Sequence, residues 1–218
     1  MRAPPVLTRL DGASDPRAAD AVIDWPASAF AHNAAALLRK VRSVKRGEGA
    51  AVALITAPEA GIAKTSIAVA LARVAALSNL KVAVIDADLH RPSASRAMGL
   101  APQPAGLIEL LTGSVPLSRA CVRDPRSSAL VLSPVQPPRD PAAVLGSAKM
   151  AALTDHLRRT CDLVIFCGPT MLATGEVKAL ARLSDAIVVA TRDESVERSA
   201  AALESVRAKA AAGLVLVR

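Results

Sequence analysis

Five short runs of apolar residues alternate with segments of helical character along this chain of 218 residues. Each run is almost free of polar residues, which is typical of strands that are covered by helices on both faces of a sheet. Strands that alternate with helices form a parallel sheet, so the pattern predicts an α/β fold with a doubly wound, mostly parallel sheet. The predicted strands are residues 50–57, 81–86, 162–166, 186–191 and 213–217.

The segments outside these runs predict the helices and the domain boundary. A chain of this length fits a single α/β domain, which we place at residues 25–218. Residues 1–24 are polar and rich in Pro, Asp and Arg, so we expect a flexible N-terminal tail. The longer predicted helices are residues 26–43, 64–76, 145–160 and 197–212.

The net charge of +8 comes largely from arginines that are spread along the sequence. This charge either reflects an Ala- and Arg-rich composition or attracts an acidic surface, such as anionic lipid, an acidic protein or nucleic acid. With two Phe, one Trp and no Tyr, the chain lacks the aromatic platform on which single-stranded nucleic acids stack. Because the arginines also form no dense patch in the sequence, we expect no specific nucleic-acid partner.

The cysteines and the apolar content indicate the compartment. Cys121, Cys161 and Cys167 cannot all pair within one chain, and they form no C-x-x-C motif that would favour zinc. No run of 18 apolar residues predicts a membrane-spanning helix, and residues 1–17 lack the apolar stretch of a signal peptide. We therefore expect a cytoplasmic protein with reduced thiols.

The segment LITAPEAGIAKTS, residues 54–66, has the layout of a phosphate-binding loop: an apolar strand, a loop of small residues, then a helix. In such a loop, backbone N–H groups and the helix N-terminus surround the phosphates. The general pattern G-x-x-x-x-G-K-[ST] assigns Lys64 to the phosphate charge and Thr65 to Mg²⁺. The predicted nucleotide-binding residues are Gly61, Lys64, Thr65 and Ser66.

Two positions of this loop depart from the pattern. Ala63 stands where the second glycine is expected, and Pro58 stands where the first is expected. A Cβ at position 63 costs little if the backbone φ angle is negative there, and about 1–3 kcal/mol if it is positive. An ordinary strand–turn–helix with a chance Lys-Thr pair remains the alternative at this point.

Two acidic residues follow the second predicted strand, in the sequence VAVIDADLHRP of residues 82–92. Ligands of a doubly wound sheet bind at the carboxyl ends of its strands, where Asp86 and Asp88 are expected. Carboxylates two residues apart can hold the shell of Mg²⁺ or accept a proton from a hydroxyl group, so both are candidate catalytic residues. Thr65 and Asp86 are the candidate Mg²⁺ ligands, and a solvated turn is the alternative.

Three segments together resemble the bacterial tyrosine kinases (BY-kinases) of capsule and exopolysaccharide assembly. The family's loop, roughly TSPGPGEGKST, is similar to TAPEAGIAKTS of residues 56–66, and its hhhIDADLRRP motif is similar to VAVIDADLHRP. Its connector and helix, roughly PPNPAELLGSPRMAALLAELR, are similar to PPRDPAAVLGSAKMAALTDHLR of residues 137–158. The resemblance covers about residues 28–218 and implies a P-loop NTPase fold of the MinD/ParA group that binds ATP and Mg²⁺.

Several departures from the family fall on its working parts. The family's third motif, a strand that ends in Asp, corresponds to DLVIFCGPT of residues 162–170, where Cys167 replaces the acid. That Asp belongs to the magnesium site of P-loop enzymes. A later family Asp corresponds to Glu176, and the arginine that usually follows DADL is His90.

Two further departures concern assembly and phosphorylation. The family's E-x-x-R-x-x-R pattern for ring assembly falls on Ser28, Ala31 and Ala34, so we do not expect a homo-oligomer of that ring type. The family phosphorylates tyrosines in a C-terminal tail, whereas this chain has no tyrosine and is expected to end on its last strand.

The resemblance leads to one main hypothesis and two alternatives. The main hypothesis is a pseudokinase: a BY-kinase-like regulatory subunit of exopolysaccharide or capsule polymerisation and export, with weak or no ATP hydrolysis. It would dock on cytoplasmic segments of a membrane co-polymerase and so lie at the inner membrane through this partner. The alternatives are an active ATP-dependent protein-tyrosine kinase or ATPase that acts in trans, and a MinD/ParA-like positioning ATPase.

Overall fold

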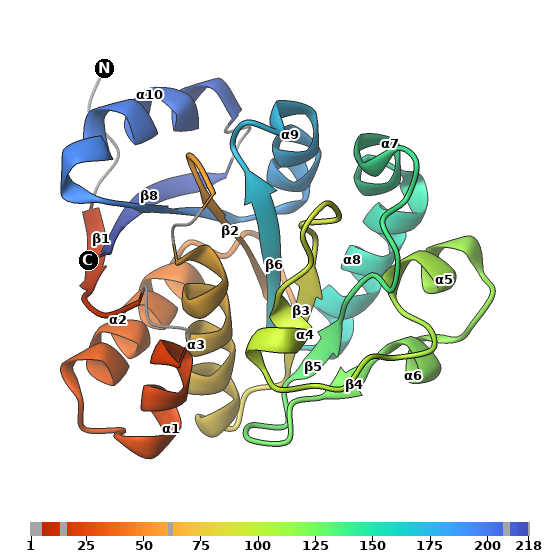
Figure 1. Ribbon diagram of the computed structural model, residues 1–218, viewed down its shortest axis with the longest axis horizontal. Helices are drawn as coiled ribbons and strands as arrows, with labels where there is room; N and C mark the ends of the chain where they lie inside the picture. Colours follow the sequence, from red (N-terminus) through yellow and green to blue (C-terminus); the bar gives the residue numbers. More distant parts are fainter. Residues whose placement is uncertain (1–5, 14–16, 61–62, 207–209, 218) are drawn as a thin grey trace.

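The computed structural model describes residues 6–13, 17–60, 63–206 and 210–217. Within these ranges, an eight-stranded sheet has the order β1-β8-β7-β2-β6-β3-β5-β4 (Figure 1). Neighbouring strands are parallel except for the short pair of β4 and β5, which confirms the predicted fold class. The strands are β1 (Val6–Leu10), β2 (Ala51–Ala57), β3 (Val82–Asp86), β4 (Val122–Arg123), β5 (Leu130–Leu132), β6 (Leu163–Thr170), β7 (Ala186–Thr191) and β8 (Ala211–Val217).

All five predicted strands are confirmed, as β2, β3, β6, β7 and β8. β6 continues beyond its predicted end to Thr170, because its pairing with β2 extends to Ala57 and Thr170. The sequence analysis missed β1, β4 and β5, which lie at or next to the edges of the sheet. β4 and β5 have only two and three residues, which is too short to produce a recognisable apolar run.

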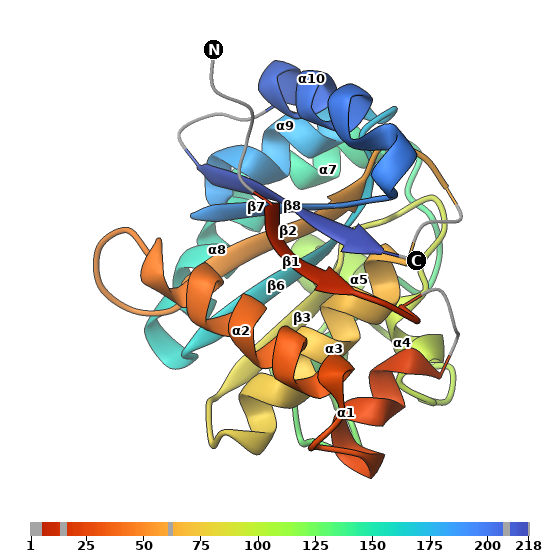
Figure 2. The same ribbon diagram turned by 90° about the vertical axis from the view of Figure 1, so that its left-hand side faces the viewer.

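Helices cover both faces of the sheet, as Figure 2 shows. One face packs against η1 (Ala18–Asp20), α1 (Ala21–Asp24), α2 (Ala29–Ser43), α3 (Lys64–Leu77) and α4 (Ala94–Ala97). The other face packs against α5 (Leu107–Thr112), α6 (Leu117–Ala120), α7 (Pro141–Leu145), α8 (Ala148–Thr160), α9 (Thr174–Leu183) and α10 (Val196–Val206), which follows η2 (Asp193–Ser195). None of the helices in the described ranges is long and apolar enough to cross a membrane.

The two cores lie on opposite faces because successive strand residues point to opposite sides of a sheet. In β2, Ala53 and Ile55 belong to one core and Val52 and Leu54 belong to the other, and all four are fully buried. α3 is buried along most of its length, since its many alanines let it lie close to the sheet and to α2. Because α3 begins at Lys64, its packing on the sheet fixes where the phosphate-binding loop ends.

One predicted helix is divided in the structure, and α1, α6 and α9 were not predicted. The segment predicted as residues 145–160 ends α7 and then forms α8, because Ser147 accepts a hydrogen bond from the backbone N–H of Met150 and so caps a new helix. α9 was not predicted, although its amphipathic spacing buries Val177 and Leu180 on one side.

The prediction of a flexible N-terminal tail is wrong for the part that the structure describes. β1 pairs with β8 in parallel, and Leu10 is fully buried in the core. The chain then passes into η1 and α1, where Ala19 and Val22 are also buried. Since the segment contributes single apolar residues to a core that other elements build, no local pattern in its sequence reveals this role.

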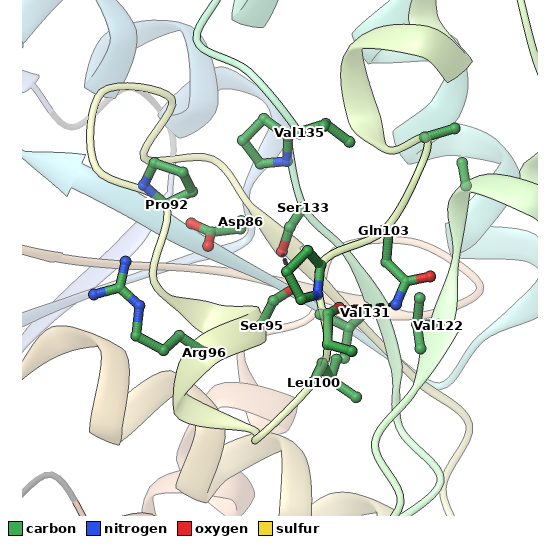
Figure 3. Close-up of a pocket in the computed structure, with 15 residues that line it drawn as sticks. Asp86, Pro92, Ser95, Arg96, Leu100, Gln103, Val122, Val131, Ser133 and Val135 are labelled. Atoms are coloured by element: carbon green, nitrogen blue, oxygen red, sulfur yellow. Dashed lines mark hydrogen bonds between the residues drawn. The ribbon is translucent and has the colours of Figure 1, made fainter.

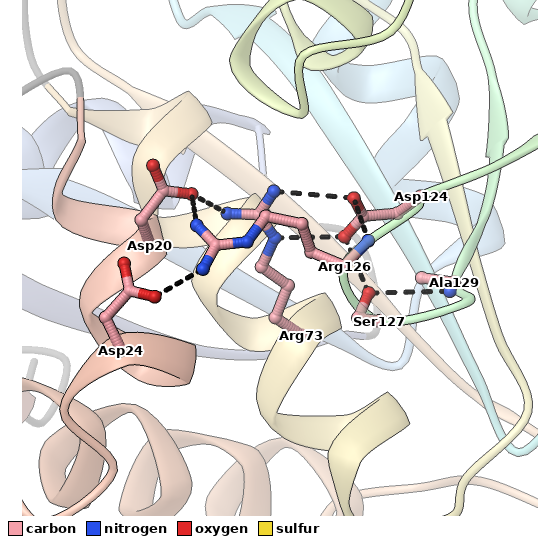
Figure 4. A network of polar contacts seen from close by, with 7 residues as sticks. All are labelled: Asp20, Asp24, Arg73, Asp124, Arg126, Ser127 and Ala129. Carbon is pink, nitrogen blue, oxygen red and sulfur yellow. Dashed lines mark hydrogen bonds and ion pairs between the residues drawn. The ribbon is translucent and has the colours of Figure 1, made fainter.

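An ionic network attaches this N-terminal segment to α3 (Figure 4). Arg73 of α3 is 1% exposed; its Nε donates to Asp124 Oδ2 at 2.9 Å, and its Nη1 donates to Asp20. Arg126 pairs with the same Asp20 at 3.0 Å and also with Asp24. The network therefore joins α1, α3 and the loop between β4 and β5, and its centre is out of contact with water.

We expect Asp124→Asn to destabilise the fold in a pH-dependent way. Burial raises the pKa of the Asp124 carboxyl group, but hydrogen bonds from Arg73 and Ser127 outweigh it, and the pKa lies below its usual value. The carboxylate therefore stabilises the folded protein fully above the pKa of the unfolded carboxyl group, and this contribution is lost as the pH falls through the lower pKa of the folded protein.

Chemical denaturation should show that Asp124→Asn lowers the free energy of unfolding by about 3–5 kcal/mol at neutral pH, because the buried Arg73 keeps only the partly exposed Asp20 as a charged partner. The difference should shrink once the pH falls below about 4. Asp155→Asn, on the exposed surface of α8, is the control and should change little at any pH. A difference that stays constant between neutral and acidic pH would contradict this account.

Candidate functional site

The phosphate-binding loop connects the end of β2 to the start of α3, at the carboxyl edge of the sheet. Ala63 has a backbone φ of −66°, a value that any L-residue adopts. The extra Cβ at this position therefore causes little backbone strain, and the low-cost case considered from the sequence applies. Gly61 lies outside the described residues, so its predicted role stays a prediction.

Lys64, the first residue of α3, is buried and already has two partners. Its ammonium group donates to Asp88 Oδ2 at 2.6 Å and to the carbonyl oxygen of Gly168 at 2.9 Å. The other oxygen, Asp88 Oδ1, accepts a hydrogen bond from the backbone N–H of Arg91 at 3.1 Å. Phosphate groups that enter the site must share Lys64 with Asp88 or displace it.

Asp86, the last residue of β3, is fully buried and uses only one of its oxygens. Oδ2 accepts hydrogen bonds from the backbone N–H groups of Ser93 and Ala94, both at 2.7 Å. Oδ1 has no hydrogen-bond partner among the residues that the structure describes. Burial raises the pKa of Asp86 to about 6, while these backbone bonds and the charge of Lys64 lower it. At neutral pH the group is therefore mostly a carboxylate with one oxygen available.

Thr65 faces the position from which the family's acid is missing. Its hydroxyl group lies 2.7 Å from Ser93 Oγ, and Cys167 Sγ lies 3.8 Å from the same hydroxyl. In the sheet, Cys167 is in register with Ile55 of β2 on one side and with Asp86 of β3 on the other. Cys167 therefore occupies the middle of the site.

Cys167 brings no charge to this position. Burial and the neighbouring Asp86 raise the pKa of its thiol to about 12, so the thiol is neutral at physiological pH. Mg²⁺ prefers oxygen ligands, and a neutral thiol is a poor substitute for a carboxylate. Cys167 instead packs in the apolar core beside α3, as a small buried residue does.

The structure brings the other two replaced positions together. His90 Nε2 lies 2.7 Å from Glu176 Oε1, so the loop after β3 contacts α9. Glu176 is buried, and its Oε2 has no hydrogen-bond partner within the described ranges. One oxygen of Glu176 is thus occupied by His90, and the other faces no polar group.

The cavity next to the phosphate-binding loop has a volume of about 480 Å³. Its walls include Lys64, Thr65, Asp88 and His90, so three of the predicted site residues share one cavity. Ser66 does not line it. Ser66 instead lines a neighbouring cavity, together with Thr65 and several arginines.

Asp86 lines a different cavity, of about 350 Å³, on the other side of the loop that follows β3 (Figure 3). Ser95 and Ser133 lie 2.7 Å apart in its wall, as donor and acceptor. Asp86 thus stands between this cavity and the residues around Lys64, whose charge acts on it. The sequence analysis expected Asp86 and Asp88 to act together, but the structure gives them different partners. Asp88 pairs with Lys64, and Asp86 accepts hydrogen bonds from the backbone of Ser93 and Ala94.

The chemistry of the residues present fits a nucleotide with Mg²⁺. Compared with the family's motif, one acidic group is missing, because position 167 is Cys. The hydroxyl oxygen of Thr65 and the unpartnered Oδ1 of Asp86 are hard oxygen donors of the type that Mg²⁺ prefers. Lys64 supplies the positive charge for phosphate. Position 167 supplies neither charge nor oxygen.

Ser93 and Gly168 are site residues that the sequence analysis missed. Ser93 contacts Thr65 through its hydroxyl group and Asp86 through its backbone N–H. A Cβ on Gly168 would lie 2.5 Å from Leu54 Cδ1 and 3.2 Å from the carbonyl oxygen of Ile55, so a larger residue would have to displace the buried side chain of Leu54. The carbonyl oxygen of Gly168 accepts a hydrogen bond from Lys64. For Gly168, the only signal in the sequence was its place directly after position 167, where the family has an acid.

Of the three positions aligned with the family's ring-assembly pattern, Ser28 is half-buried and Ala31 and Ala34 are buried. Ser28 caps α2 by accepting a hydrogen bond from the backbone N–H of Ala31 at 3.2 Å. Ala31 and Ala34 are buried in the core. These positions therefore present no side chain that could replace the family's charged contacts.

Comparisons with known proteins agree with this geometry. Residues 53–215 match the family described as the CobQ/CobB/MinD/ParA nucleotide binding domain. The tyrosine-protein kinase YwqD of Bacillus subtilis is 30% identical over 149 residues, which cover 68% of this chain and 62% of YwqD. EpsB of Ralstonia solanacearum is provisionally named a tyrosine-protein kinase. It is 28% identical over 141 residues, which cover 65% of this chain. This chain covers only 19% of the length of EpsB.

The solved kinase domain of the Escherichia coli tyrosine kinase ETK has the same fold, with a TM-score of 0.80 at 23% identity over 91% of this chain and 80% of that chain. The named relatives confirm the resemblance to BY-kinases that the three sequence segments predicted. Since the family match extends over most of the sequence, the chain belongs to the CobQ/CobB/MinD/ParA nucleotide-binding domain family.

Proposed function

We propose that this chain is a BY-kinase-like regulatory subunit of exopolysaccharide or capsule polymerisation and export, a pseudokinase that binds ATP·Mg²⁺ weakly and hydrolyses it slowly or not at all. One observation carries the proposal: Lys64 and Thr65 line one cavity and Asp86 lies beside position 167, where a neutral thiol stands in place of the acid expected from the family. The link to polysaccharide export comes from the resemblance to BY-kinases.

Weak binding follows from the charges at the site. Lys64 is neutralised by Asp88 across 2.6 Å in a place with little water, so phosphate must compete with an existing buried salt bridge. Mg²⁺ would offset the negative charge of the phosphates and of Asp86 and Asp88. Without an acid at position 167, that ion loses a group that orients it, which typically costs about 10–100-fold in affinity or activity.

Each surviving residue has a role in this proposal. Bound Mg²⁺ would supply Lewis-acid chemistry at the phosphates. Thr65 and Asp86 Oδ1 would hold the ion, and Lys64 would turn from Asp88 to the phosphate oxygens. Asp88, released from Lys64, would then be able to accept a proton from a hydroxyl group.

The second candidate is an active kinase or ATPase that acts in trans on another protein. The unpartnered Oδ1 of Asp86 favours it, because a buried carboxylate oxygen is ready to meet a metal ion or a substrate proton. This chain itself has no tyrosine, so such an activity would need a tyrosine-bearing partner. A MinD/ParA-like positioning ATPase is less favoured, since the early loop position used there for a second lysine is Glu59 or a neighbour, none of them lysine.

Lys64→Ala should weaken the binding of ATP·Mg²⁺ by about 10–100-fold, because a charge-assisted hydrogen bond contributes about 1.5–3 kcal/mol. Isothermal titration calorimetry of the purified chain measures this affinity. Lys178→Ala, on the exposed side of α9, is the matched control and should bind as the wild type does. Absence of binding by the wild type at millimolar ATP would refute the nucleotide part of the proposal.

Cys167→Asp should restore part of the lost magnesium site. We expect it to tighten Mg²⁺-dependent nucleotide binding by about 10–100-fold, because it places a carboxylate beside Thr65. Cys167→Asn has nearly the same shape without the charge and should give no gain. Titrations with and without EDTA measure the effect, and equal behaviour of the two variants would show that a charge at position 167 is not what the site lacks.

The partner part of the proposal is tested separately. The purified chain should bind immobilised peptides that span the cytoplasmic segments of the polysaccharide co-polymerase of the same bacterium, as measured by biolayer interferometry. Scrambled peptides of the same composition are the control, because they retain the charge and lose the sequence. If every native segment behaved like its scrambled version, the docking proposal would be wrong, whatever the outcome for ATP.

A further inference from the structure

The two ends of the parallel strands differ in their charged residues. β2, β3, β6 and β7 run in parallel, so their carboxyl ends form one edge and their amino ends form the opposite edge. At the carboxyl edge acids and bases are mixed: Asp86, Asp88 and Glu176 lie with Lys64, Arg91 and Arg96. The solvent-accessible basic residues at the amino edge, which we call the basic end, are Arg39, Lys40, Arg42, Lys45, Arg46, Lys81, Arg158, Arg159 and Arg182.

Acidic residues offset only part of this charge. They are Glu48, Asp162, Asp185 and, in the last turn of α10, Glu204. Asp185 is 1% exposed and is held by Arg158 at 2.7 Å and by Arg46 at 3.4 Å, so its charge is turned inward. The basic residues at this end therefore outnumber its acidic residues.

Hydrogen bonds hold the elements of the basic end side by side. The backbone N–H of Ala50 donates to the carbonyl oxygen of Arg158 at 2.8 Å, which attaches the loop after α2 to the end of α8. The backbone N–H of Asp162 donates to the carbonyl oxygen of Lys81 at 2.7 Å, which attaches the start of β6 to the start of β3. The cations thus lie on neighbouring elements at one end of the sheet.

Helix dipoles explain only some of these cations. Basic residues are favoured in the last turn of a helix, where Lys40, Arg42, Arg158, Arg159 and Arg182 lie. Lys45, Arg46 and Lys81 lie in the loops between helix and strand, where no helix requires them. These loop cations extend the charge from the helix ends across the edge of the sheet.

We propose that the basic end is a docking surface for an anionic phospholipid membrane, with the nucleotide site on the opposite end facing away from the lipid. Each Lys or Arg near an anionic leaflet strengthens binding about fivefold, so several cations on one surface suffice without an inserted helix. None of the aromatic residues of the chain lies at this end, which disfavours a single-stranded polynucleotide. The choice of lipid over duplex DNA rests on the proposed function, which puts the chain beside a membrane protein.

The test is co-sedimentation of the purified chain with vesicles of phosphatidylglycerol and phosphatidylcholine, compared with vesicles of phosphatidylcholine alone. We expect binding to the anionic vesicles only, and weaker binding as salt is raised, because salt screens these charges. The triple variant Arg39→Glu, Arg42→Glu, Lys45→Glu should bind at least about 100-fold more weakly. These three side chains are exposed, so we expect the variant to fold. A thermal melt of the variant is the check. The milder triple change to Gln serves if the variant is not folded.

The matched control is Arg139→Glu, Arg192→Glu, Arg198→Glu, which changes the net charge by the same amount with exposed residues outside the basic end. It should retain most of the binding. Equal loss in both triple variants, no preference for anionic vesicles, or tighter binding to duplex DNA than to the vesicles at the same salt would overturn the proposal. The vesicles contain neither nucleotide nor co-polymerase, so a failure here leaves the proposed function to its own tests.

Discussion

The site depends on the position of β6 between β2 and β3. Through these two pairings, residue 167 lies beside Ile55 on one side and beside Asp86 on the other, and residue 168 lies directly under the start of α3. At position 168, a residue larger than glycine would have to displace the buried side chain of Leu54. The loop, the acids and the position of the missing acid therefore meet because three strands end together at one edge.

This arrangement shows which residues a change at position 167 affects. Where the family has a carboxylate, the chain has a thiol that burial keeps neutral, so Thr65 and Asp86 have no charged neighbour at position 167. Lys64 meanwhile is satisfied by Asp88 and by a backbone carbonyl. Lys64 therefore has partners in the absence of a ligand, whereas Oδ1 of Asp86 has none among the described residues.

The same parallel sheet separates the candidate nucleotide site from the basic end. The buried acids and Lys64 lie where strands end, and the cations of the basic end lie where strands begin and helices end. Helix dipoles favour this polarity, because the carboxyl end of each helix attracts cations. If the basic end meets lipid, the nucleotide site remains accessible to a ligand or a partner from the other side.

Long elements and the family motifs were predictable, because continuous apolar runs and the segments around residues 56–66 and 82–92 are local patterns. Lys64, Thr65 and Asp88 were correctly expected to lie together. β1 was not predictable, since Leu10 is one apolar residue in a polar segment and gains its burial from β8, far away in the sequence. The divided helix and the pairing of His90 with Glu176 were missed for the same reason: they depend on contacts between distant segments.

The sequence by itself determined the fold class, the family, the loss of the acid at Cys167 and the absence of tyrosine, because residue identity and short-range periodicity are enough for these conclusions. Only the tertiary structure decided that Ala63 is unstrained, that Asp86 keeps an unpartnered oxygen, that Lys64 is held by Asp88, and that scattered arginines form one basic end. Backbone angles, desolvation and charge clustering depend on which distant segments pack together, and no local pattern in a sequence records that.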